Sequence, residues 1–148
     1  MNFWKLSPWL SRLIILAVAA LFAMISFKFV LDPQHAAASS GIGLISAVGY
    51  TNLRAGFGGF PLAFALLLLF CLFSSRRLLV ALASIATVGG VVLAVRLYGA
   101  GLDGTFSESA HLLVPETAIV VIALLGVLME TRRRTRTGLD SAHIGGPA

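Results

Sequence analysis

Residues 53–98 read LRAGFGGFPLAFALLLLFCLFSSRRLLVALASIATVGGVVLAVRLY, which is two apolar runs joined by the short polar segment Ser74-Ser75-Arg76-Arg77. Each run has about the 20 residues that an α-helix needs to cross a hydrocarbon core of about 30 Å. Because the joining segment is so short, the two helices must be antiparallel neighbours. The stretch therefore predicts a hairpin of two membrane-spanning helices, over residues 53–73 and 78–98.

Two further apolar runs flank this hairpin, over residues 13–31 and 112–129. The first also resembles a signal peptide, because Ala17-Val18-Ala19 mimics a cleavage site. That triplet lies in the middle of the run, so we expect the run to be retained as a span. The predicted fold class is an all-α membrane protein, a four-transmembrane-helix bundle in a single domain over residues 1–136. A flexible C-terminal tail is expected over residues 137–148.

The composition supports a membrane protein. Hydrophobic residues make up 58% of the 148 residues and charged residues only 11%, and the mean hydropathy is +0.96. A soluble domain of this length could not bury so much apolar surface. The net charge of +5 does not indicate nucleic acid, because four of the eleven basic residues follow the last apolar run directly, where anionic lipid headgroups lie: Arg132, Arg133, Arg134 and Arg136.

Local signals refine the spans. The long connector over residues 32–52 contains an apolar stretch, residues 41–48, for which we expect a short helix on the outer surface. Thr51 or Asn52 is expected to cap the second span. Pro61 falls inside that span and predicts a kink, with the carbonyl freed near Phe57 needing a partner from water or a neighbouring helix.

The start of the fourth span carries two further signals. Pro115 is placed in its first turn, where a missing amide costs least. Glu116 follows it, where a negative charge suits the helix dipole.

The basic residues predict the orientation of the chain, because cytoplasmic loops retain Lys and Arg during insertion. With both termini in the cytoplasm, one membrane face collects Lys5, Arg12, Arg76, Arg77 and the arginines from Arg132 to Arg136. We therefore expect a multi-pass protein of a bacterial inner membrane, with Asp32, Asp103 and Glu108 on the periplasmic side.

Small residues recur at every fourth position on the two central helices. Ala55, Gly59 and Ala63 do so on the second span, and Ala86, Gly90 and Ala94 on the third. Such stripes let two helix backbones approach closely. We expect these stripes to face each other or another span, so that leucine at Gly59 or Gly90 would disrupt the bundle.

Ionisable residues inside the apolar runs are the candidate binding residues. Under the predicted topology Lys28, Arg54, Arg96 and Glu116 all converge on the outer half of the bilayer. One interpretation is that the cations extend to the outer headgroups while Glu116 caps its helix or pairs with Arg96. The other is a mostly cationic pocket for an anionic or quinone-like ligand, lined by Lys28, Asn52, Arg54, Arg96 and Glu116.

Metal and nucleophile chemistry find little support in the sequence. Glu108-Ser109-Ala110-His111 has the Glu-x-x-His spacing of di-iron bundles, but it occurs once and such sites need two copies with further carboxylates. His35 and His111 could share a metal only as exposed loop residues. We therefore expect no catalytic set, no resident metal and no cofactor.

Four short motifs stand out in the spans and the connectors: Leu53-Arg54-Ala55-Gly56-Phe57-Gly58-Gly59, Arg96-Leu97-Tyr98-Gly99, Leu102-Asp103-Gly104 and Pro115-Glu116. In these motifs the chain resembles the small bacterial four-span membrane proteins gathered as domain of unknown function 4345. The resemblance covers the chain from the first span to the fourth. Members often carry an acidic residue two places before the arginine, where this chain has Asn52. The resemblance implies a fold and marks six positions, but no reaction: Arg54, Gly58, Gly59, Arg96, Asp103 and Glu116.

These features favour a small accessory or binding protein. Its expected partners are membrane lipids and either a larger membrane complex or further copies in a homo-oligomer, with no nucleic acid. A membrane enzyme with Glu116 as acid or base is the alternative, as is a small transporter that acts as an oligomer. The packing stripes and the polar pocket decide in favour of binding, because no catalytic set accompanies them.

Overall fold

The computed structural model describes the backbone of residues 3–144 and the side chains of residues 7–136. Within this range the regular elements are helices: α1 (Phe3–Leu31), α2 (Pro33–Ser39), α3 (Ala47–Leu53), the π-helical turn η1 (Arg54–Gly59), α4 (Phe60–Leu72), α5 (Leu78–Asp103) and α6 (Phe106–Ile144). Four stretches are long and apolar enough to cross a membrane: Ser7–Leu31, Ala47–Leu72, Leu78–Asp103 and Phe106–Arg136. The chain is therefore an all-α multi-pass membrane protein with four spans, as predicted.

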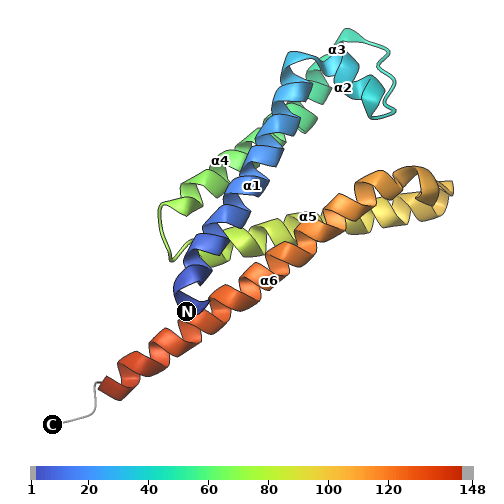
Figure 1. Cartoon of the computed structure of the whole chain (residues 1–148). Helices are drawn as coiled ribbons and strands as arrows, with labels where there is room; N and C mark the ends of the chain where they lie inside the picture. Colours follow the sequence, from blue (N-terminus) through green and yellow to red (C-terminus); the bar gives the residue numbers. More distant parts are fainter. Residues whose placement is uncertain (1–2, 145–148) are drawn as a thin grey trace. The chain divides into compact units, whose positions relative to one another are not determined.

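The chain divides into two compact units. The first, which we call the α1/α4 unit, comprises residues 15–73. The second, the α5/α6 unit, comprises residues 1–14 and 74–148. In the α5/α6 unit the two long helices lie side by side (Figure 1). In the α1/α4 unit Phe22 of α1 packs against Phe64 of α4, with the ring centroids 5.2 Å apart. Large apolar side chains remain exposed along the helices, which fits helices that face lipid.

The second span begins earlier than the sequence indicated. Ser46 is the cap, since its hydroxyl accepts a hydrogen bond from the amide of Gly49 at 3.2 Å. The prediction of Thr51 or Asn52 as cap is therefore wrong, and both residues lie inside α3. The reason is that Ala47 to Tyr50 contains no proline, and its one glycine, Gly49, costs only about 1 kcal/mol in a helix, so the helix extends backwards to the serine.

Pro61 is accommodated by the π-helical turn that precedes it. In η1 the amide of Phe60 bonds to the carbonyl of Ala55, five residues back. Widening the turn in this way places Pro61 in the first turn of α4, where its missing amide costs little. A neighbouring helix also supplies a donor near the predicted position, because the hydroxyl of Ser26 in α1 donates to the carbonyl of Gly58 at 2.6 Å.

The connector between the first two spans contains a short helix, but not where the sequence placed it. Helix α2 covers Pro33–Ser39, with Asp32 accepting from the amide of His35 at its start. Residues 41–46, at which the predicted helix over residues 41–48 would begin, are not helical. Pro33 directly after an aspartate is a strong helix start, and this signal outweighs the apolar content of the later stretch.

The α5/α6 hairpin is tighter than expected. Helix α5 ends at Asp103, Gly104 takes a left-handed conformation with φ of +67°, and α6 begins at Phe106. The predicted connector over residues 99–111 is thus mostly helical. Pro115 and Glu116 lie in the third turn of α6 rather than its first, because nothing between Phe106 and Val114 interrupts the helix. The helix dipole therefore does not explain Glu116.

Helix α6 also continues beyond the predicted end of the domain. It extends to Ile144, whereas the sequence predicts a flexible tail over residues 137–148. Gly138 is the only glycine or proline between Arg132 and Ile144, and a single glycine inside a helix costs only about 1 kcal/mol. The last four residues of the predicted tail lie outside the described residues.

The close helix contacts are made by different glycines from those predicted. A Cβ atom on Gly58 would lie 2.5 Å from Val30 Cγ2 in α1, whereas one on Gly59 would meet only the carbonyl of Arg54, at 3.9 Å. In the α5/α6 unit a Cβ atom on Gly89 would lie 2.9 Å from Val120 Cγ2, and one on Gly90 would meet nothing within 4 Å. The stripes through Gly59 and Gly90 are therefore not the contact surfaces within these units.

Candidate functional site

Lys28 and Arg54 lie together at one end of the α1/α4 unit. The Lys28 ammonium donates to the hydroxyl of Ser39 in α2, with Nζ and Oγ 2.9 Å apart. The Arg54 guanidinium donates from Nε to the carbonyl of Val30, in the last turn of α1, at 3.2 Å. Both side chains belong to exposed residues. The two cations therefore flank the same short stretch of α1.

Neither cation has a carboxylate partner among the residues that the structure describes. Ser39 and Val30 supply only a hydroxyl and a carbonyl oxygen, both neutral. Asp32, the nearest acidic residue in sequence, is paired with His35 at 2.8 Å. Asn52 lies on the exposed part of α3, two residues before Arg54, with no side-chain hydrogen bond to a described residue. This end of the unit therefore carries two positive charges that no described anion neutralises.

Arg96 and Glu116 form a two-pronged ion pair in the α5/α6 unit. Arg96 Nε and Nη2 each donate to a different carboxylate oxygen of Glu116, both at 2.8 Å. The two side chains are 33% and 23% exposed. This confirms the predicted pairing. Both oxygens of Glu116 therefore accept from the same guanidinium.

The sequence predicts that these five residues line one pocket. The structure brings Lys28 and Arg54 together and, separately, Arg96 and Glu116, and the two pairs belong to different units. Arg96 and Glu116 neutralise each other and so offer no net charge to an anion. The cationic character that the sequence assigned to the pocket is thus carried by Lys28 and Arg54.

A buried carboxylate at the other end of the α5/α6 unit escaped the sequence analysis. Glu130 is fully buried and accepts hydrogen bonds from Arg133 and Arg134, three and four residues further along α6. Arg134 also donates to the carbonyl of Arg76 at 2.6 Å, and Arg12 to the hydroxyl of Ser75 at 3.4 Å. The spacing of Glu130 from its two arginines is the ordinary pattern for helical ion pairs, so this signal was readable in the sequence.

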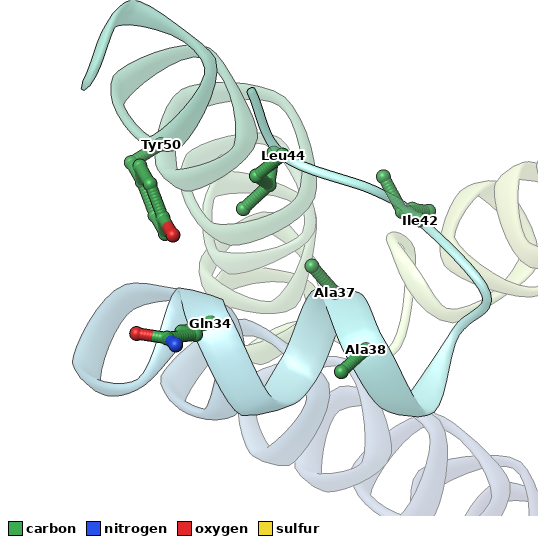
Figure 2. A pocket seen from close by; sticks show the side chains of 6 residues that line it. All are labelled: Gln34, Ala37, Ala38, Ile42, Leu44 and Tyr50. Carbon is green, nitrogen blue, oxygen red and sulfur yellow. The ribbon is translucent and has the colours of Figure 1, made fainter. Parts of the chain in front are cut away.

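A partly open hollow of about 190 Å³ lies between α2 and α3 in the α1/α4 unit, and was also not foreseen. It is lined by Gln34, Ala37, Ala38, Ile42, Leu44 and Tyr50 (Figure 2). The unusual length of the connector was the available signal, because long structured connectors are often functional.

Metal chemistry gains no support from the described part of the chain. No group of three or more His, Cys, Asp or Glu side chains gathers there in a way that could hold a metal ion. His35 pairs with Asp32, and His111 Nδ1 contacts the carbonyl of Glu108 at 2.7 Å. Cys71 is half-buried as a free thiol in α4.

No protein-family model, no curated protein and no solved structure matches this chain. The resemblance to domain of unknown function 4345 therefore stays a prediction from its motifs.

Proposed function

We propose that this chain is a small accessory or binding protein of a bacterial inner membrane, and that it holds an anionic lipid-soluble ligand at the outer end of the α1/α4 unit. The observation that carries the proposal is the pair of cations, Lys28 and Arg54, bound only to neutral oxygens. Basic side chains at a membrane surface attract anionic headgroups by about 1 kcal/mol each. A headgroup phosphate or carboxylate would supply the charge that the described residues do not.

The proposed orientation puts both termini in the cytoplasm. It is supported by the contacts that gather basic residues at one end of the α5/α6 unit, where Arg12 and Arg134 bind the Ser75-Arg76 turn. Lys and Arg are retained on the cytoplasmic side of bacterial membranes. Lys28 lies near the end of the first span and Arg54 near the start of the second, whereas Arg12 and the Ser75-Arg76 turn lie at the other ends of these two spans. In this orientation Lys28 and Arg54 are therefore periplasmic.

Reporter fusions test the orientation. A reporter that is active only in the cytoplasm should be active when it is fused to the chain after Arg77 or after Arg136. A chain truncated after Gly104, in the turn between α5 and α6, should instead activate a periplasmic reporter. The reverse pattern would overturn the orientation and the periplasmic placement of the two cations.

Lipid retention tests the ligand. We expect the double variant Lys28→Gln/Arg54→Gln to retain about ten- to thirtyfold less copurifying anionic lipid than the parent protein, because two contacts of about 1 kcal/mol each are removed. The measurement is native mass spectrometry after gentle extraction, followed by lipid identification. The matched control is Lys28→Arg/Arg54→Lys, which keeps a positive charge at both positions and should retain the lipid.

Two results would contradict the proposal. Equal lipid retention by the parent and the Lys28→Gln/Arg54→Gln variant would show that these cations only anchor their helices at the headgroup level. Equal loss in both double variants would show that lipid loss does not follow from removing the two positive charges, with no anion site at α1.

A further inference from the structure

We propose that the hollow between α2 and α3 binds one neutral ring bearing carbonyl oxygens, as in a quinone headgroup. This site is separate from the cation pair, because neither Lys28 nor Arg54 lines the hollow. Its size, its lining and its rigidity each support the assignment.

The volume of the hollow suits a single ring. An apolar protein cavity of about 150 Å³ holds one benzene molecule, and pockets for drug-sized ligands begin at about 300 Å³. At about 190 Å³ the hollow lies between the two. It therefore has room for one substituted ring but not for a whole lipid, and an attached tail would have to leave through the open side.

The lining selects for a neutral ligand that accepts hydrogen bonds. Four of the six lining residues are aliphatic, and none is charged. Figure 2 shows the ring of Tyr50 reaching from α3 toward α2, where Gln34 lies on the same side of the hollow. The phenol hydroxyl and the side-chain amide can both donate, and neither is hydrogen-bonded to a described residue. Carbonyl oxygens on an otherwise apolar ring would satisfy these donors.

The walls of the hollow are already held in place without a ligand. Ala37 is buried in a small core with Phe29, Ala36 and Leu53, and the lining residues Ile42 and Leu44 pack against this core. Helix α2 is fixed at its start by Asp32 and at its end by the bond from Lys28 to Ser39. A preformed site loses less ordering free energy on binding than a flexible loop.

A photoreactive azido-benzoquinone with a decyl tail tests the proposal on the full chain in detergent. After illumination and peptide mapping, the label should concentrate on residues 34–50 and be displaced by the unlabelled decyl benzoquinone. Tyr50→Phe and Gln34→Leu should each weaken the apparent affinity about three- to tenfold, the effect of losing one hydrogen bond.

A pair of alanine variants separates filling of the hollow from general damage. Ala38 is exposed and lines the hollow, so Ala38→Leu should abolish the label on residues 34–50. Ala47 is exposed on α3 but does not line it, so Ala47→Leu should label like the parent. Labelling spread evenly along the spans, or unaffected by both Ala38→Leu and Tyr50→Phe, would overturn the proposal.

The two proposed sites can fail independently. Arg54→Gln, which leaves the bond from Lys28 to Ser39 at the end of α2 intact, should keep the quinone label while losing anionic lipid, and Ala38→Leu should do the opposite. Loss of the quinone label in the Arg54 variant would show that the ring site is part of the anion site, and would overturn the separation inferred from the lining.

Discussion

Gly58→Leu should lower the stability of the protein by about 1–3 kcal/mol, the usual cost of overpacking a close contact. The side chain would meet Val30 Cγ2 at 2.5 Å, with backbone atoms of Val30 and Ser26 at 3.5 and 3.6 Å. Valine in a helix has essentially one allowed side-chain rotamer, so α1 and η1 must move apart. That movement would also break the hydrogen bond from Ser26 to the Gly58 carbonyl. Thermal melting in detergent would report the loss.

The adjacent glycine is the matched control. Gly59 is exposed, and a Cβ atom there meets only a backbone oxygen at 3.9 Å. Gly59→Leu should therefore melt like the parent, or slightly higher because leucine favours helix more than glycine does. The same contrast is expected between Gly89→Leu and Gly90→Leu in the α5/α6 unit. If Gly59→Leu were the more damaging of the first pair, the contact surface assigned to η1 would be wrong.

The number of spans could be predicted from the sequence, but the faces by which they pack could not. The length of the apolar runs is enough to predict four spans, because nearly every residue of a helix that crosses the hydrocarbon core must be apolar. The same uniformity hides the packing face, since residues toward lipid are as apolar as residues toward a helix. Gly58-Gly59 and Gly89-Gly90 are both double glycines. The four-residue spacing of small residues predicts a helix contact at the second glycine of each pair, whereas the structure makes it at the first.

The π-helical turn explains part of this error. The buried positions Gly58, Ala65 and Leu68 follow ordinary helical spacing, but Leu53 and Gly58 are five residues apart. The extra residue in η1 rotates the start of the second span relative to α4. A stripe drawn with strict four-residue spacing through Ala55 and Gly59 therefore leaves the contact face.

One part of the candidate site, the Arg96–Glu116 pair, could be predicted because both residues belong to the same helical hairpin. The α5/α6 turn brings the end of one helix beside the start of the next, so Arg96 and Glu116 could be paired from topology alone. Glu130 was missed for a different reason. It follows the predicted span over residues 112–129 directly, whereas Ala123, Gly126 and Glu130 share the buried face of α6. The hollow depends on how a long connector folds back, which local sequence patterns do not encode.

Removing either partner of the Arg96–Glu116 pair should cost more than removing both. A lone charge left among apolar helices costs on the order of 2–3 kcal/mol, and each single variant, Arg96→Leu or Glu116→Leu, creates one. The double variant leaves none. We therefore expect a coupling energy of about 1–3 kcal/mol in a double-mutant cycle measured by reversible unfolding or by thermal melting.

The Asp32–His35 pair supplies the control for this cycle. Its atoms are also 2.8 Å apart, but its side chains are 56% and 86% exposed, against 23% and 33% for Glu116 and Arg96. Exposed ion pairs contribute roughly 0–1 kcal/mol, so a cycle with Asp32→Asn and His35→Leu should show little coupling. Equal coupling in the two cycles would mean that burial is not what strengthens the Arg96–Glu116 pair. Strictly additive effects at Arg96 and Glu116 would mean that the two charges are solvated separately, and Arg96 would then again be available to an anionic ligand.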